Sequence, residues 1–166
     1  MNGGNFTNFQ LKPMKTALFA GSFDPITKGH EDIILRGLPL FDKIVIGVGT
    51  NTSKKYLFSI EQRLKWLKET FKNQPKIEVL AYEGLTIDFC KKINATYLLR
   101  GLRNPIDYNY ESNIALMNKT LNREIETIFL LTSPHLMAIN STIVRDIIIN
   151  KGDACKFVPD LIKNDF

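Results

Sequence analysis

The chain has 166 residues, which fits one ordinary domain. Hydrophobic residues make up 44% of it and charged residues 23%, which excludes a disordered or fibrous protein. The 22 lysines and arginines outnumber the 17 aspartates and glutamates, so the formal net charge is +5. This excess favours anionic ligands but is too small to indicate a nucleic-acid-binding protein.

Two cysteines, Cys90 and Cys155, form no CxxC motif and have no regular spacing. A disulfide scaffold is therefore excluded, and two reduced, mostly buried thiols are expected. No apolar run approaches the ~20 residues that a membrane span requires. We expect a soluble, cytoplasmic protein without a membrane partner.

Residues 1–13 show neither helical nor strand periodicity, and Met14-Lys15 resembles a second start. We interpret residues 1–13 as an upstream extension or a cloning remnant, and residues 14–166 as the single domain.

Apolar runs and helical periodicity alternate along the rest of the chain. In chain order the sequence predicts a strand at 16–20, a helix at 30–38, a strand at 43–48, a helix from Ser59, a strand at 77–81, a helix at 86–93, a strand at 97–99, a helix at 108–121, a strand at 127–131, a helix at 141–149 and a last short helix near Pro159. This alternation predicts an α/β fold, a doubly wound five-stranded parallel sheet with helices on both faces. Ligands bind such sheets at the carboxyl ends of the strands.

The loop after the first strand runs from Gly21 to His30 and contains neither GxGxxG nor GxxxxGK[ST]. It ends at a helix start, where free N–H groups and the helix dipole favour an anion. A lone histidine is more often structural, but the position of His30 at the end of this loop favours a functional role.

Three further segments offer groups that bind anions. Lys54 follows the second strand, where a solvated basic turn is the alternative. Arg100 and Arg103 follow the fourth strand, and their guanidinium forks match phosphate oxygens, with surface salt bridges as the alternative. Asn140, Ser141 and Thr142 precede the last long helix, where a plain N-cap would explain one of the three.

These segments carry two motifs. Thr27-Lys28-Gly29-His30 and Ile139-Asn140-Ser141-Thr142-Ile143-Val144-Arg145 resemble the TxGH and ISSTxxR signatures of the cytidylyltransferase-like nucleotidyltransferases. Within that superfamily, residues 100–111 are similar to the RGLRxxxDxxYE block of the phosphopantetheine adenylyltransferases. The resemblance covers residues 14 to about 160 and implies a nucleotidyltransferase fold.

The resemblance implies an enzyme of coenzyme A biosynthesis that converts ATP and 4′-phosphopantetheine to dephospho-coenzyme A and pyrophosphate. His30 and Lys54 match its catalytic residues. The positions that match substrate contacts are Ser22, Lys54, Thr86 and Arg100. Those that match ATP contacts are Ser22, Phe23, His30, Gly101, Leu102, Arg103, Glu111, Leu136, Met137, Ala138, Ile139, Asn140, Ser141 and Thr142.

The resemblance also suggests Mg²⁺ as cofactor, although no acidic cluster in the sequence forms an all-protein cage for it. It suggests a homohexamer with helix 108–121 near an interface, and feedback binding of coenzyme A. A sibling enzyme acting on nicotinamide mononucleotide would share TxGH and ISSTxxR but is not expected to carry the 100–111 block. A non-enzymatic nucleic-acid binder would lose affinity steeply with salt and release no pyrophosphate.

Overall fold

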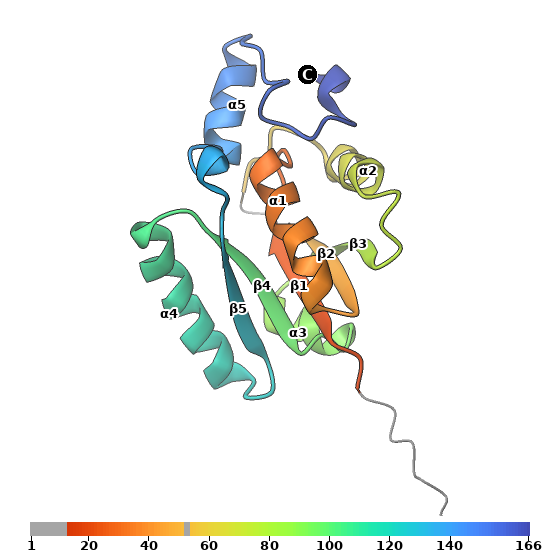
Figure 1. Cartoon of the computed structure of the whole chain (residues 1–166), viewed down its shortest axis with the longest axis vertical. Helices are drawn as coiled ribbons and strands as arrows, with labels where there is room; N and C mark the ends of the chain where they lie inside the picture. Colours follow the sequence, from red (N-terminus) through yellow and green to blue (C-terminus); the bar gives the residue numbers. More distant parts are fainter. Residues whose placement is uncertain (1–12, 52–53) are drawn as a thin grey trace, which may run out of the picture.

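A computed structural model describes residues 13–51 and 54–166 as a parallel sheet with helices on both faces (Figure 1). The strands lie in the order β3-β2-β1-β4-β5, with bounds β1 (Thr16–Gly21), β2 (Lys43–Thr50), β3 (Ile77–Glu83), β4 (Tyr97–Leu102) and β5 (Glu126–Leu131). The helices are α1 (Lys28–Gly37), α2 (Ile60–Thr70), α3 (Thr86–Lys92), α4 (Pro105–Leu121) and α5 (Ser141–Ile149), with 3₁₀ turns η1 (Leu38–Leu40), η2 (Pro134–Leu136) and η3 (Lys163–Asp165). The predicted five-stranded, doubly wound parallel sheet is confirmed.

The central strand β1 divides the core into two layers, because successive side chains point to opposite faces. Ala17 and Phe19 pack into the cluster that includes α1 and α2, whereas Leu18 and Ala20 pack into the cluster under α3. Burying a side chain the size of Leu18 contributes about 1.5–3 kcal/mol. Both faces of β1 are thus fixed, and its carboxyl end is held in place.

Several predicted bounds differ from the structure by two or three residues, and one predicted helix is absent. The fourth strand does not end at residue 99, because Arg100, Gly101 and Leu102 continue pairing with β5. Gly101 fits there because a Cβ atom would lie 2.9 Å from Cγ1 of Ile33 on α1. The short helix expected near Pro159 is replaced by turns and η3, in which hydrogen bonds join residues three apart, as between the Ile162 N–H and the Pro159 carbonyl.

The proposed extension at residues 1–13 lies outside the described residues except for Pro13. Cys90 and Cys155 are both free thiols, and burial raises the pKa of Cys90 to about 11. In the described part of the chain, no helix is long and apolar enough to cross a bilayer.

The close packing at Gly47 in β2 leads to a stability prediction. A Cβ atom there would lie 2.8 Å from Cδ1 of Leu18 and 3.1 Å from the Tyr82 ring, so Gly47→Ala should lower the free energy of unfolding by about 1–2 kcal/mol. Gly49→Ala, on the same strand, is the matched control, because a Cβ atom there would come no closer than 3.4 Å to its nearest neighbour, the Tyr82 hydroxyl. Urea denaturation of both variants measures the difference, and equal stabilities would contradict the packing argument.

Candidate active site

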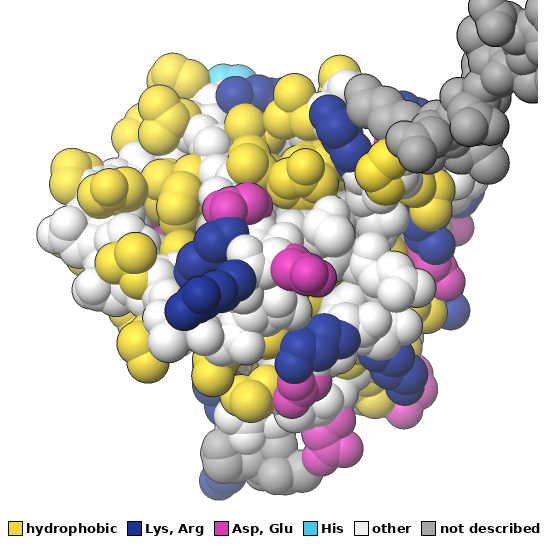
Figure 2. Space-filling model, turned by 90° about the horizontal axis from the view of Figure 1, so that it is seen from below, with side chains coloured by type: hydrophobic (Ala, Val, Ile, Leu, Met, Phe, Trp, Pro, Cys, Tyr) yellow, Lys and Arg dark blue, Asp and Glu magenta, His cyan; other side chains and the backbone are white. Residues whose placement is uncertain are grey.

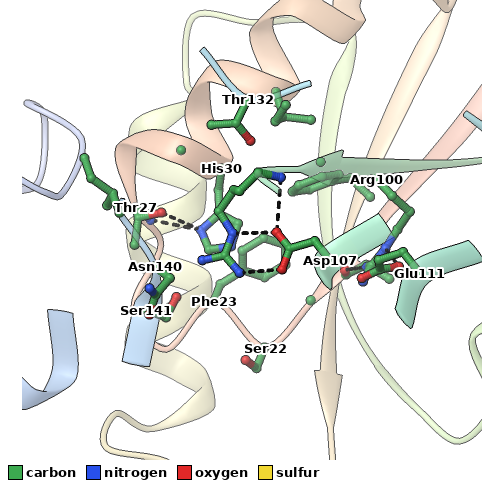
Figure 3. A pocket seen from close by; sticks show the side chains of 18 residues that line it. Ser22, Phe23, Thr27, His30, Arg100, Asp107, Glu111, Thr132, Asn140 and Ser141 are labelled. Carbon is green, nitrogen blue, oxygen red and sulfur yellow. Dashed lines mark hydrogen bonds and ion pairs between the residues drawn. The ribbon is translucent and has the colours of Figure 1, made fainter. Parts of the chain in front are cut away.

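A cavity of about 340 Å³ lies at the carboxyl ends of β1 and β4, beside the N-termini of α1 and α5 (Figure 3). Gly21 at the end of β1, Arg100 and Gly101 near the end of β4, and Thr132 just after β5 line its walls. The N-termini of two helices therefore meet at one cavity. This arrangement suits a ligand with more than one negative charge.

The loop between β1 and α1 is held by a buried carboxylate. Asp24 is 2% exposed, and its two oxygens accept hydrogen bonds from the N–H groups of Leu57 and Phe58, each at 2.9 Å. Its carbonyl accepts from Nη1 of Arg145 on α5 at 2.8 Å. The loop is thus tied to the segment before α2 and to α5.

Phe23 occupies the same loop in the left-handed backbone region, with φ of 48°. This conformation is uncommon for a residue with a bulky side chain and marks a locally constrained turn. Its ring is buried and meets the His30 ring edge-on, with 5.2 Å between centroids. The Phe23 ring therefore packs against the histidine ring. Because the ring is occupied in this way, a ligand would contact Phe23 through its backbone.

His30 is the third residue of α1 and forms a capping box with Thr27, the N-cap. The Thr27 N–H donates to Nδ1 of His30 at 3.1 Å (Figure 3). Since Nδ1 accepts this hydrogen bond, the ring proton lies on Nε2, on the other edge of the imidazole. Burial, reinforced by Arg100 and Arg103, lowers the pKa of His30 to about 4. At neutral pH the histidine is therefore an uncharged N–H donor in the cavity wall.

The two arginines on the opposite wall are each paired with a carboxylate of α4. Arg100 donates from Nε to Glu111 at 2.8 Å and from Nη2 to the same carboxylate, and its Nη1 donates to the Ala20 carbonyl at 2.6 Å. Arg103 forms a fork with Asp107, at 2.8 Å and 2.9 Å. Although burial opposes it, hydrogen bonding from Arg103 keeps the pKa of Asp107 below its usual value. These pairs fix the guanidinium planes but also neutralise much of their charge.

The segment that follows β5 is anchored to α1. Asp32 accepts hydrogen bonds from the N–H and hydroxyl of Ser133, at 3.2 Å and 2.9 Å. Further along, Asn140 caps α5 by accepting from the Ile143 N–H at 3.0 Å, and the Ser141 hydroxyl donates to the Pro25 carbonyl at 2.8 Å. The start of α5 is thereby fixed against the β1–α1 loop.

A second cavity of about 220 Å³ adjoins the first. Ala20, Arg100 and Glu111 line both, so the ion pair forms part of the wall of each. The remainder of the second wall comes mainly from aliphatic residues of α3 and α4, together with Thr86 and Asn118. The pair of cavities can hold a charged group next to a longer, less polar group.

Most of the residues predicted from sequence meet at these cavities. Those lining the first are Ser22, Phe23, His30, Arg100, Gly101, Arg103, Glu111, Ile139, Asn140 and Ser141, and Thr86 lines the second. Those that do not line the first cavity are Lys54, Leu102, Leu136, Met137, Ala138 and Thr142.

Three residues with polar side chains that the site prediction omitted also line the first cavity: Thr27, Asp107 and Thr132. Thr27 and Asp107 lie within the quoted motifs, and Thr132 is the first polar residue after β5, so each had a signal in the sequence.

Comparison with known proteins identifies the family. The cytidylyltransferase-like family matches residues 18–147. A phosphopantetheine adenylyltransferase of Flavobacterium psychrophilum is 54% identical over 90% of this chain and 99% of its own length. Another, of Caldanaerobacter subterraneus, is 46% identical over 90% of this chain and 93% of its own.

A crystal structure from Vibrio parahaemolyticus, described as a nicotinate-nucleotide adenylyltransferase, has a similar fold. Its TM-score is 0.68 at 16% identity, and the match covers 91% of this chain and 97% of that chain. The fold is therefore shared with nucleotide adenylyltransferases, whereas the high identities lie within one narrower group. The chain belongs to the cytidylyltransferase-like nucleotidyltransferases and, within them, to the phosphopantetheine adenylyltransferases.

Proposed function

We propose that this enzyme transfers the adenylyl group of ATP to 4′-phosphopantetheine, forming dephospho-coenzyme A and pyrophosphate in coenzyme A biosynthesis. The observation that carries the proposal is the pair of adjoining cavities in a chain 54% identical to a phosphopantetheine adenylyltransferase. The first cavity suits the phosphates of ATP, and the second, lined by Thr86, suits the pantetheine arm. Arg100 lies between them, where the acceptor phosphate would meet ATP.

In the proposed reaction an oxygen of the acceptor phosphate attacks the α-phosphorus of ATP in line, and the bond from that phosphorus to the oxygen bridging the α- and β-phosphates breaks, which releases pyrophosphate. The acceptor is already an anion, so no general base is required. The protein must align two polyanions and stabilise charge that develops on the α-phosphate. The neutral Nε2–H of His30 is a suitable donor for that charge.

The other predicted contacts are retained as proposals. The hydroxyl of Ser22 and the side chain of Lys54 would contact the acceptor phosphate. Lys54 is exposed after β2 and would have to reach inward. Gly101, Leu102, Arg103 and Glu111 would contact ATP, as would the segment 136–142, which reaches the first cavity at residues 139–141.

We propose Mg²⁺ as the cofactor, supplied with ATP. Within residues 13–51 and 54–166 no group of three or more His, Cys, Asp or Glu side chains could hold a metal ion. Asp107 and Glu111, the carboxylates lining the first cavity, are paired with arginines. This donor set fits an ion bound through phosphate oxygens and water, which is common for Mg²⁺. When bound, it would screen the charge of the triphosphate.

We also propose that coenzyme A inhibits the enzyme by feedback, since it contains the pantetheine arm and would compete for the second cavity. The two free thiols support a cytoplasmic location.

The acceptor specificity tests the proposed function. Incubation with ATP, Mg²⁺ and a panel of phosphate acceptors should release pyrophosphate with 4′-phosphopantetheine and form dephospho-coenzyme A, detected by mass spectrometry. Nicotinamide mononucleotide serves as the control acceptor, because the fold is shared with enzymes for such nucleotides. Turnover with that acceptor but not with 4′-phosphopantetheine would overturn the proposal.

Two variants of His30 separate its proposed catalytic role from its capping role. His30→Ala should lower kcat on the order of 10²–10³-fold with little change in ATP affinity, because one transition-state donor is lost. Loss of the cap should also cost about 1 kcal/mol of stability. His30→Gln is the matched variant, since glutamine at this helix position can reach the N-cap N–H. It should recover the melting temperature but not kcat, and a near-normal kcat would refute the catalytic role.

We propose a homohexamer with α4 near an interface. No described residue of α4 is buried, and hydrophobic side chains gather on the side where α4 lies (Figure 2). The exposed apolar residues of this helix are Ile106, Tyr108, Tyr110, Leu116, Met117 and Leu121. Exposed apolar side chains of this kind support the proposal that another subunit covers α4.

Sedimentation should therefore give about six times the 19.0 kDa mass of the chain. Leu116→Glu should lower that mass, whereas Leu161→Glu, also at an exposed leucine but away from α4, should not. A monomeric wild-type protein at micromolar concentration would contradict the hexamer.

A further inference from the structure

Arg63 on α2 is a buried cation with no acidic partner in the part of the chain that the structure describes. It is 2% exposed, and no carboxylate oxygen of those residues lies within 4.0 Å of its guanidinium nitrogens. Arg100, Arg103 and Arg145, by contrast, each lie within that distance of a carboxylate. Burying an unpaired charge is costly, so other contacts of Arg63 must offset the loss of its hydration.

The guanidinium of Arg63 contacts the β1–α1 loop from behind. Its Nη1 donates to the Ser22 carbonyl at 2.7 Å, and its carbon lies 4.1 Å from the centroid of the Tyr56 ring. Its Nε makes a longer contact, 3.4 Å, with the Ser59 carbonyl. Arg63 does not line the first cavity, whereas Ser22 does. The arginine therefore holds the outer side of a loop whose inner side forms the wall.

The contact with Ser22 fixes a peptide plane. In a trans peptide the carbonyl of one residue and the N–H of the next point in opposite directions. With the Ser22 carbonyl held by Arg63, the Phe23 N–H points away from Arg63, and both Ser22 and Phe23 line the first cavity. No acceptor for this N–H occurs among residues 13–51 and 54–166. The left-handed φ of Phe23 completes a turn of the kind that presents N–H groups to anions.

We propose that Arg63 is a positioning residue of the adenylyl-transfer site: through the Ser22 carbonyl it directs the Phe23 N–H at a phosphate group of the bound nucleotide. This inference rests on the proposed function. The unpaired charge adds a positive potential behind the same peptide. Lysine cannot replace the arginine, because a single ammonium cannot donate to Ser22 and also lie flat over Tyr56.

Kinetics of two variants test the proposal. Arg63→Met should lower kcat/KM for ATP on the order of 10²-fold, because small displacements at a reacting centre have effects of that size. Arg63→Lys keeps the charge and should still lose at least about tenfold by the same misplacement. The control is Leu67→Ala, one turn later on α2 and fully buried, which removes core packing from the same helix but no hydrogen bond to Ser22. Assayed well below its melting temperature, this control should retain kcat/KM within about threefold, since its effect is on stability.

A binding experiment reports on the Phe23 amide itself. In protein labelled with [¹⁵N]phenylalanine, pyrophosphate should shift the Phe23 amide signal of the wild type and of Leu67→Ala, but not that of Arg63→Met or Arg63→Lys. If Arg63→Met does not fold, Arg63→Lys decides the outcome.

Folded Arg63 variants with wild-type kcat/KM and a wild-type Phe23 response would overturn the proposal, as would a wild-type Phe23 amide that ignores pyrophosphate. A failure of the proposed function would appear differently. The wild type would then form no dephospho-coenzyme A, while the pyrophosphate titration would still report on Arg63.

Discussion

The buried carboxylate of Asp24 is the constraint on which the site depends. It accepts two backbone hydrogen bonds from residues 57 and 58, and its own carbonyl is held by Arg145 of α5. Hydrogen bonds to a charged group contribute about 1.5–3 kcal/mol each, and leaving such a buried charge unsatisfied would cost more. The loop after β1 therefore cannot shift without breaking contacts to both neighbouring segments. This loop supplies part of the wall of the first cavity and anchors the start of α5, which supplies another part.

The same packing that stabilises the loop sets the chemistry of His30. Phe23 fills the space beneath the imidazole, and the Thr27 N–H occupies Nδ1, so both the tautomer and the orientation are fixed. Burial lowers the pKa of the ring to about 4, and two nearby guanidinium groups act in the same direction. A neutral donor held in this way needs no reorganisation when charge develops on a ligand, which is the condition for effective electrostatic stabilisation.

The charge of the site is more balanced than the arginine-rich motif suggests. Arg103 and Arg100 are matched by carboxylates in the first and second turns of α4, so their guanidinium groups act as oriented donors more than as free cations. Two helix N-termini, and Arg63 behind the loop, add to the positive potential of the cavity. Such fixed dipoles and buried charges are screened less by salt than surface lysines are.

The sequence by itself determined the order of strands and helices along the chain, because hydrophobic periodicity and helix caps are local signals. Ser59 and Asn140, for example, cap their helices, as the residues around them predict. The sequence also placed His30 at a helix N-terminus beside a strand end. Only the tertiary structure decided that β4 extends through Arg100, that the arginines pair with Asp107 and Glu111, and that Lys54 lies outside the cavity wall. These outcomes depend on pairing between segments far apart in the chain, and no local pattern encodes the distance or direction between them.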